Sequence, residues 1–250
     1  MLISDPAARS TRSVEKHAAL MRFLSAEIWT TAEIIGELWG ISSRQGVHKT
    51  LMQYEAEGDI RRHTLPVAGS SNVTLWGITN HGAAMAVEGD SEAAYIEQFK
   101  SMRYFDPSRL SLSRVPHHLD LQRTRLAMER AGWTGWTRGE ALGFKRELRP
   151  DAVVTRPDGV RLAIEVERTI KTRKRYGVVI AGHLANIQQG SWQGVWYLCP
   201  DRVARTLPRL FASIDVVRHA GRTVPFDDSL RRYFRIHDMA ECLRGLNHGD

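Results

Sequence analysis

The sequence contains little cysteine and no long hydrophobic run. Two cysteines, Cys199 and Cys242, are too few for the disulfide framework of a small secreted domain. No run of about eighteen apolar residues is present, so a membrane-spanning helix is not expected. The first residues also lack the charged and apolar regions of a signal peptide. We therefore expect a cytoplasmic protein without a membrane partner, in which Cys199 is a core thiol.

Positive charge is abundant. Among 250 residues, 35 are Lys or Arg and 28 are Asp or Glu, which gives a net charge of +7. The hydrophobic content of 42% is typical of a folded protein, and the length suits one large or two small domains. An excess of basic residues favours a polyanionic partner, and nucleic acid before an anionic membrane. Basic side chains also serve solubility, so the charge alone leaves the partner open.

The first part of the chain, residues 1–90, has the pattern of three helices followed by two short strands. This order is typical of a winged helix-turn-helix DNA-binding domain, and Trp39-Gly40-Ile41 can form the tight turn before the recognition helix. The expected elements are a helix over 14–26 with Val14, Ala18, Met21 and Leu24 on its apolar face, a helix from a cap at Thr30 or Thr31 to Gly40, a helix from a cap at Ser42 or Ser43 to about residue 57, and strands over 60–65 and 73–78.

The third of these helices has polar and basic residues at its start, and the first strand has two arginines. Arginine and glutamine are the side chains that read the edges of guanine and adenine with paired hydrogen bonds. A winged helix can instead bind another protein, but basic residues on both the helix and the strand favour DNA. The predicted DNA-binding residues of this domain are Ser43, Arg44, Gln45, His48, Lys49, Arg61 and Arg62.

The rest of the chain divides into a linker over 91–114 and a second domain over 115–250. A helix, three strands that can pair antiparallel, a second helix and a further strand match a restriction-endonuclease-like α/β core. The overall prediction is thus an α/β protein with two domains. The expected elements are a helix over 116–131, strands over 144–148, 151–155 and 161–168, a helix over 172–187, a strand over 194–198, a helix over 201–213 and a strand over 214–217.

Carboxylates gather where two of these strands pair. Asp151 stands at the head of one strand, Glu165 and Glu167 lie on the next, and the turn residues Arg156-Pro157-Asp158-Gly159 stand between them. Antiparallel pairing would bring the carboxylates to one edge of the sheet, and residues two apart share a face. Such carboxylates repel one another unless a hard cation such as Mg²⁺ lies among them. The alternative is a solvated strand face preceded by a turn.

A basic segment follows Glu165 and Glu167 directly. Next to a metal site it would provide a phosphate-binding surface, and otherwise it is the solvated start of a helix. The residues of this segment are Arg168, Lys171, Arg173, Lys174 and Arg175.

The whole plan resembles the replication-relaxation family of plasmid and mobile-element proteins, in which a winged helix precedes a nuclease-like domain. The resemblance covers about residues 14–200. It rests on Pro116-His117-His118-Leu119, on Arg149-Pro150-Asp151, and on Leu162-Ala163-Ile164-Glu165-Val166-Glu167-Arg168-Thr169 with the basic helix behind it. The nuclease-like domain is expected to have a PD-(D/E)xK-like fold.

This resemblance implies a function at an origin of transfer or replication. Asp151, Glu165 and Glu167 fall where nuclease-fold relaxases hold a divalent metal, here Mg²⁺ or Mn²⁺. The implied substrate is double-stranded DNA, which would be nicked with or without partner proteins at the origin. A homodimer is one of the oligomeric states left open.

One departure from the nuclease pattern puts cleavage in doubt. The usual motif ends in a lysine two residues after the acid, and this chain has Glu167 there. Either Lys171 or Lys174 takes over the role of that lysine, or the domain binds DNA without cutting it. In the second case the protein is a non-catalytic transcription or replication regulator.

Further candidates are weaker. Tyr176 is a possible covalent nucleophile, although a tyrosine near a helix start is more often a packing residue. His117 and His118 are adjacent on a helix, so they cannot easily bind one ion. Either Glu140 or Glu147 could complete a metal shell. The stretch 231–235 is either an added DNA contact or a packing strand.

Overall fold

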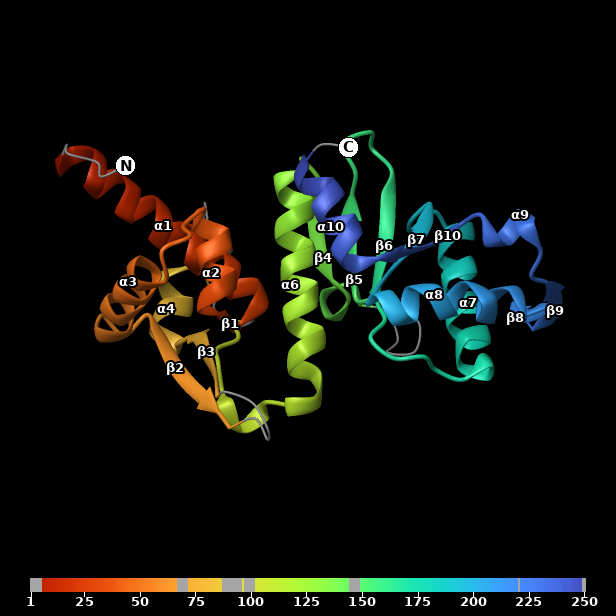
Figure 1. Ribbon diagram of the computed structural model, residues 1–250, viewed down its shortest axis with the longest axis horizontal. Helices are drawn as coiled ribbons and strands as arrows, with labels where there is room; N and C mark the ends of the chain where they lie inside the picture. Colours follow the sequence, from red (N-terminus) through yellow and green to blue (C-terminus); the bar gives the residue numbers. More distant parts are fainter. Residues whose placement is uncertain are drawn as a thin grey trace. The chain divides into compact units, whose positions relative to one another are not determined.

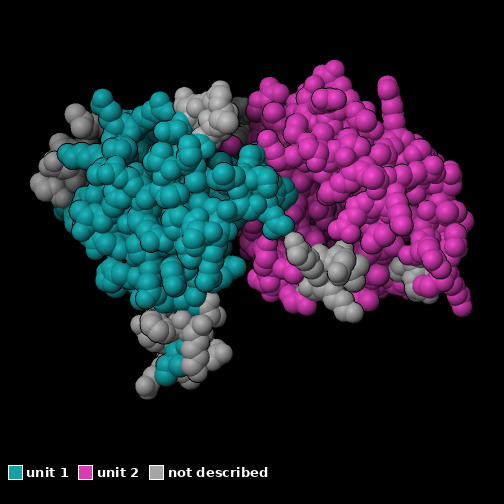
Figure 2. All heavy atoms as spheres, turned by 90° about the horizontal axis from the view of Figure 1, so that it is seen from below, with its two compact units in different colours: residues 1–122 teal, residues 123–250 magenta. Residues whose placement is uncertain are grey.

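The computed structural model describes residues 6–66, 72–86, 96, 102–143, 149–219 and 221–248. The chain divides into two compact units, residues 1–122 and 123–250, which Figure 2 distinguishes by colour. The division falls inside helix α6 (Val115–Arg130), so the start of this helix belongs to unit 1. The sequence pattern instead places the start of the second domain at residue 115. Within the described ranges, no helix is both long enough and apolar enough to span a membrane.

Unit 1 consists of helices around a three-stranded antiparallel sheet with the strand order β1-β3-β2 (Figure 1). The expected order of three helices and a hairpin is present, and the short strand β1 is an addition that the sequence analysis missed. The elements are α1 (Pro6–Glu27), β1 (Trp29–Thr31), α2 (Ala32–Trp39), α3 (Arg44–Ala56), β2 (Ile60–Leu65), β3 (Val73–Ile78) and α4 (Asn80–Met85).

Side-chain caps define where α2 and α3 begin. The hydroxyl of Thr31 accepts a hydrogen bond from the backbone N–H of Ile34, and that of Ser43 accepts one from Gly46. These hydroxyls satisfy backbone donors that the helix itself cannot pair. The structure therefore selects Thr31 and Ser43 from the two pairs of candidates in the sequence.

The prediction of the apolar face of α1 is correct only in part. The helix begins well before residue 14, and Val14 is 67% exposed. Ala18 is exposed as well, whereas Met21 and Leu24 are buried as predicted. The helix contacts α2, α4 and the sheet, and its buried residues, which include Leu20, lie toward its C-terminal end. Val14 and Ala18 are four residues apart and both exposed, so they share a face of the helix that points away from the core.

Phe105 closes the sheet of unit 1 on one side. Its ring lies so close over Gly77 of β3 that a Cβ atom on this glycine would overlap it. The backbone N–H of Phe105 donates to the carbonyl of Ile78 over 2.8 Å, and its side chain packs with Leu75 and Val115. The segment predicted to be a linker thus contributes a core residue to unit 1.

Unit 2 is built on a five-stranded mixed sheet with a separate two-stranded sheet beside it. Short 3-10 turns connect some of the elements. The helices and strands after α6 are β4 (Thr134–Arg138), β5 (Ala152–Thr155), β6 (Arg161–Val166), α7 (Arg173–Gln188), β7 (Gly194–Cys199), α8 (Asp201–Ala212), β8 (Val216–His219), β9 (Arg222–Pro225), α9 (Asp228–Arg231), β10 (Phe234–Asp238) and α10 (Met239–His248). The 3-10 turn of unit 2 is Gly139–Ala141, and the turns Pro107–Arg109 and Leu112–Arg114 belong to unit 1.

The strand order of the large sheet is β10-β7-β6-β5-β4. Strands β4, β5 and β6 pair antiparallel, whereas β6, β7 and β10 pair parallel. The predicted antiparallel pairing of the two carboxylate strands is confirmed, with Ala152 opposite Ile164. Because β6 is the central strand, the carboxylates lie at strand ends in the middle of the sheet. The expectation that they reach an edge of the sheet is therefore wrong.

Three of the predicted strand segments do not correspond simply to strands of the large sheet. The expected strand over 144–148 lies outside the described residues, and the first strand of the sheet is β4, which the sequence analysis missed. The predicted strand over 214–217 forms β8, which pairs with β9 outside the main sheet. The stretch 231–235 runs from the end of α9 into β10, which pairs parallel with β7, so Phe234 and Arg235 belong to a strand of the sheet.

Helices cover both faces of the large sheet. In Figure 1, α7 and α8 lie on one side, and α10 and the C-terminal part of α6 lie on the other. Both faces of β6 are consequently buried, as Ala163 and Ile164 show with 0% exposure. Val153, Ala163 and Tyr197 belong to the core cluster that also contains Ile180 of α7. Side chains on this face of the strands, Glu165 included, are enclosed against α7.

Candidate functional sites

A cavity of about 150 Å³ in unit 2 contains the three predicted metal ligands. Asp151 stands just before β5, Glu165 lies in β6 and Glu167 follows β6 directly. We call this space the carboxylate cavity. Its lining residues come from the strand ends, from the loop after β6 and from α7, and they are Arg149, Asp151, Glu165, Glu167, Lys171, Arg175, Tyr176, Val179, His183 and Tyr197.

Backbone hydrogen bonds hold Asp151 in place. The N–H of Val166 donates to its carboxylate Oδ2 over 2.8 Å, and the N–H of Gly139 donates to its carbonyl over 3.0 Å. The N–H of Asp151 itself donates to the carbonyl of Ile164. The residue is thus anchored to the neighbouring strand on which Glu165 lies.

Glu165 is paired with a histidine that the sequence analysis did not identify. Nε2 of His183 lies 2.9 Å from Oε1 of Glu165, and the two side chains are 3% and 14% exposed. Burial raises the pKa of Glu165, the charge of Asp151 raises it further, and His183 opposes both effects. His183 stands in the buried stripe of α7 that also contains Tyr176 and Ile180. A polar residue in an otherwise apolar helical stripe was the signal that could have identified it.

Glu167 forms an ion pair with Lys171. The Nζ atom of Lys171 lies 2.8 Å from Oε2 of Glu167, whose side chain is only 4% exposed. Lys174 instead lines a separate groove between α7 and β8, together with Arg173. Of the two lysines considered as replacements for the missing motif lysine, the structure brings Lys171 alone to the carboxylate cavity.

The other basic residues of this segment lie in different places. Arg175 lines the carboxylate cavity. Arg173 forms an ion pair of 2.9 Å with Asp215, and Arg168 is exposed on the loop before α7. The predicted phosphate-binding surface is therefore spread over the loop and over two sides of the α7 start.

Tyr176 has the features of a core residue. It is 1% exposed, and its hydroxyl accepts a hydrogen bond from the backbone N–H of Lys171 over 3.3 Å. Burial raises the pKa of Tyr176, which opposes formation of the phenolate that a nucleophile requires. Its ring packs against Phe211 of α8. These observations favour packing over a covalent role.

The remaining candidate histidines and acids lie elsewhere or are not described. His118 stacks on Trp29 at 4.4 Å between ring centroids, and its Nε2 lies 3.2 Å from the carbonyl oxygen of Glu27, all within unit 1. Glu140 lies 3.7 Å from Arg138 and does not line the carboxylate cavity. Glu147 lies outside the described residues.

The chemistry of the carboxylate cavity suits a divalent cation, although its side chains are not arranged as a ligand set. Carboxylate oxygens are the ligands that Mg²⁺ and Mn²⁺ prefer. In the described part of the chain, no group of three His, Cys, Asp or Glu side chains is positioned to hold a metal ion. Glu165 and Glu167 are directed toward His183 and Lys171 instead.

A second site lies in unit 1, where a cleft of about 600 Å³ opens between α3 and the strands β2 and β3. We call it the basic cleft. Threonines of the two strands form part of its floor, and Trp76 lies edge-on to His48 with ring centroids 6.1 Å apart. The lining residues are Ala32, Arg44, Gln45, His48, Lys49, Arg62, Thr64, Thr74 and Trp76. Arg44, Gln45, His48, Lys49 and Arg62 are all among the predicted DNA-binding residues.

Two of the DNA-binding residues predicted for unit 1 do not line the basic cleft. Successive side chains of a strand point to opposite faces, and this separates Arg61 from Arg62. The guanidinium of Arg61 lies over the ring of Phe105 and donates to the carbonyl of that residue. Arg62 lines the basic cleft, with its Nε 3.3 Å from Oε2 of Glu55. The hydroxyl of Ser43 is engaged as the cap of α3.

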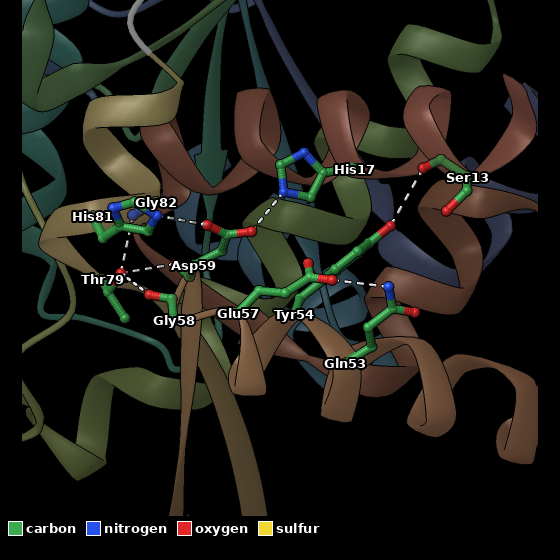
Figure 3. Close-up of polar contacts among 10 residues, drawn as sticks. All are labelled: Ser13, His17, Gln53, Tyr54, Glu57, Gly58, Asp59, Thr79, His81 and Gly82. Carbon is green, nitrogen blue, oxygen red and sulfur yellow. Dashed lines mark hydrogen bonds and ion pairs between the residues drawn. The ribbon is translucent and has the colours of Figure 1, made fainter. Parts of the chain in front are cut away.

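A polar network ties the helices of unit 1 together on the side shown in Figure 3. Asp59 lies 2.7 Å from Nε2 of His17 and 3.6 Å from Nε2 of His81, so one carboxylate connects α1, α4 and the turn before β2. The hydroxyl of Tyr54 donates to the carbonyl of Ser13 over 3.3 Å. The network therefore supports the positions of α3 and β2, which form the basic cleft.

Each unit thus presents one site with a defined chemistry. The basic cleft offers cationic and amide donors, and the carboxylate cavity combines acids with bases. A comparison of the chain with models of protein families, with curated proteins and with solved structures finds no match.

Proposed function

We propose that the protein binds double-stranded DNA through unit 1, which acts as a winged helix-turn-helix domain. The observation that carries this proposal is the basic cleft, where Arg44, Gln45, His48 and Lys49 of α3 meet Arg62 of β2. Arginine and glutamine at the start of a recognition helix can read base edges, and the other basic residues can contact phosphates. The net charge of +7 supports a polyanionic partner.

We further propose that unit 2 is a PD-(D/E)xK-like domain that nicks DNA with the help of a divalent metal. The element order α6-β4-β5-β6-α7-β7 supports this assignment, as does the meeting of Asp151, Glu165 and Glu167 in one cavity. When bound, Mg²⁺ or Mn²⁺ supplies Lewis acidity and lowers the pKa of a coordinated water. The three carboxylates would hold it.

The position of Lys171 supports a role for it in this proposed reaction. Its Nζ reaches the carboxylate of Glu167 over 2.8 Å from the loop before α7. An ammonium group there can orient an attacking water or stabilise the charge that develops on the phosphate. Lys171 therefore replaces the lysine that the usual motif has at the position of Glu167.

The resemblance to the replication-relaxation family suggests where this activity is used. A DNA-binding domain joined to a nicking domain suits the start of plasmid transfer or replication, where one site must be recognised and one strand opened. Partner proteins at the origin and a homodimer are compatible with this proposal.

A second candidate function is a DNA-binding regulator whose nuclease-like core is inactive. The pairing of Glu165 with His183 and of Glu167 with Lys171 favours it, because both carboxylates have partners among the protein's own side chains. In this case unit 2 would extend the DNA-binding surface without chemistry.

The test is cleavage of a supercoiled plasmid that carries the DNA upstream of the protein's own coding sequence. We expect open-circle product with Mg²⁺ or Mn²⁺, no product with a chelator, and no product from Glu165→Ala, which should still shift the DNA in a gel. Glu140→Ala is the matched control, because this exposed acid lies outside the carboxylate cavity. No product from the wild type under any metal, with the gel shift retained, would favour the regulator. Absence of a gel shift would contradict DNA binding itself.

A further inference from the structure

A groove of about 970 Å³ lies in unit 2 between α7 and β8, and it shares no lining residue with the carboxylate cavity. We call it the α7–β8 groove. Two valines that line it are largely open to solvent, Val178 of α7 at 46% and Val216 of β8 at 53% exposure. The rest of the α7 wall is made mainly of small residues, namely Gly177, Ala181, Gly182 and Ala185. The groove therefore presents apolar surface that a second chain can cover.

Strand β8 meets this groove with its edge. Val216, Val217 and Arg218 all line the space. Successive side chains of a strand point to opposite faces, so a groove that touches three residues in a row lies along the edge of the strand. On its other edge β8 pairs antiparallel with β9, and no further strand pairs with β8 within the described ranges. The edge toward the groove thus carries backbone N–H and C=O groups without a strand partner.

The charged residues along the α7–β8 groove are all basic. They are Arg173, Lys174 and Arg218, and no acid is among the lining residues. Arg173 is paired with Asp215. Lys174 and Arg218 form no ion pair with any residue that the structure describes. A segment with acidic side chains would find partners there, whereas a basic segment would be repelled.

An open strand edge, an apolar wall and unpaired cations together fit one mode of recognition. In that mode an extended peptide adds a strand to the edge of a sheet, and its alternate side chains fill the groove beside the strand. We propose that the α7–β8 groove binds an extended acidic segment of a partner protein, which pairs with β8. Apolar side chains of the segment cover Val178 and Val216, and its acids pair with Lys174 and Arg218. The inference goes beyond the proposed function and does not depend on it.

The probe is a fluorescent peptide of about eight residues, a usual strand length, in which valine alternates with glutamate. Its binding to the full chain is followed by fluorescence anisotropy, and we expect saturable binding. Two matched peptides carry lysine in place of glutamate or serine in place of valine. Each should bind at least about tenfold more weakly, because the first reverses the charge and the second removes the apolar contacts.

Hydrogen exchange of the protein's own backbone tests the pairing with β8. The bound peptide supplies acceptors to the N–H groups at the open edge, so amide exchange in β8 should slow when the peptide is added. Binding through side chains alone would leave this exchange unchanged. Peptide binding without protection of β8 would overturn the proposed strand addition.

Gly177 offers a variant that fills the groove without disturbing the fold. A Cβ atom at this glycine would meet nothing within 4 Å. The larger side chain of Gly177→Leu extends into the groove and should weaken binding of the peptide by about tenfold or more. Gly177→Ala is the matched control, because it adds only the Cβ atom, and it should stay within about twofold of the wild type. Thermal unfolding checks that both variants are folded.

Variants of the two unpaired cations test the charge. Lys174→Met and Arg218→Met should each weaken binding by about two- to fivefold, the range of an exposed ion pair. Absence of saturable binding to the wild type, or equal binding of the lysine peptide, would overturn the inference.

Two other occupants of the groove have their own signatures. Self-association in the ultracentrifuge that Gly177→Leu abolishes and Gly177→Ala retains would assign the groove to a second copy of the chain. A gel shift of DNA that Gly177→Leu alone weakens would assign it to DNA. Either result would overturn the assignment to a partner protein. Failure of the proposed DNA binding or nicking is seen separately, in the plasmid assay with the wild type.

Discussion

Nε2 of His183 lies 2.9 Å from Oε1 of Glu165, between the middle of α7 and the central strand of the large sheet. The two residues are eighteen positions apart in the sequence, and their pairing is one reason that a carboxylate can be enclosed between a sheet and a helix. Trp192 and Tyr197 surround the imidazole with ring contacts and hold it in position. The pair links the core of unit 2 to the carboxylate cavity.

Replacement of Glu165 by glutamine should stabilise the fold at neutral pH. The pKa of Glu165 is raised in the folded state, so its contribution to stability is fully present below its unfolded pKa and is lost as pH rises through the folded value. Glutamine keeps an oxygen for His183 without the buried charge. We expect an increase of about 1 kcal/mol in unfolding free energy, or roughly 2–4 °C, at neutral pH and little change near pH 4. Thermal unfolding of both proteins at the two pH values measures this, and a less stable variant at neutral pH would contradict it.

Arg62 should contribute to DNA binding, whereas Arg61 should contribute to the stability of unit 1. Arg62 lines the basic cleft, so Arg62→Ala should weaken DNA binding and reduce the slope of log affinity against log salt by about 1. Arg61 contacts Phe105 on the other face of β2, so Arg61→Ala should leave the slope unchanged and lower stability by about 1 kcal/mol. Fluorescence titrations of a duplex at several salt concentrations, with thermal unfolding beside them, distinguish the two. Equal effects on DNA binding would show that both faces of the hairpin meet DNA.

Lys171 and Lys174 should differ in their effect on nicking. Lys171 lines the carboxylate cavity and Lys174 lines the groove beside β8, so only the first can assist the reaction. We expect Lys171→Met to slow nicking by about 100-fold or more, the lower end for a residue that moves or orients a proton. Lys174→Met should remain within a few-fold of the wild type, and both should retain the gel shift. A larger loss with Lys174→Met would contradict this assignment, because the assisting cation would then come from the groove beside β8.

Gly77 and Gly177 should respond in opposite directions to the same substitution. A Cβ atom at Gly77 would overlap the ring of Phe105, so Gly77→Ala should destabilise unit 1 by about 1–3 kcal/mol or more. At Gly177, inside α7, a Cβ atom would meet nothing within 4 Å, and Gly177→Ala should stabilise the protein by about 0.5–1 kcal/mol. Chemical denaturation of both variants measures the two changes. A neutral Gly77→Ala would mean that Phe105 can move away from β3 at little cost.

Local signals in the sequence predicted much of the fold. Hydroxyl residues before apolar helical stripes indicated the starts of α2 and α3, although each start had two candidates and contacts in the structure selected Thr31 and Ser43. The start of α1 was misjudged because apolar spacing at Val14 and Ala18 does not show whether a core lies opposite. Strand β4 was missed because its residues, partly exposed, do not alternate clearly.

The candidate sites were predicted to the extent that their residues are close in sequence. Glu165 and Glu167 are two positions apart, and Asp151 stands on the neighbouring strand of a hairpin, so a local pattern was enough to bring them together. Likewise, Arg44, Gln45, His48 and Lys49 lie on one short helix. His183 and Tyr197 were not recognised, because they come from α7 and β7, which only the tertiary structure brings to the carboxylates, and Arg149 was named only as part of the motif with Pro150 and Asp151.

The sequence by itself determined the α/β class, the hairpin that carries the carboxylates, and the basic start of α3, because all three depend on side-chain periodicity and turns over short distances. Only the tertiary structure decided which groups meet the carboxylates, since the parallel pairing of β6 with β7 and the packing of α7 on that face join distant segments. The same packing positioned His183 at Glu165, and the course of the loop before α7 brought Lys171 rather than Lys174 to Glu167. Such choices depend on the direction in which each helix residue faces the sheet, and that direction is set by the core as a whole.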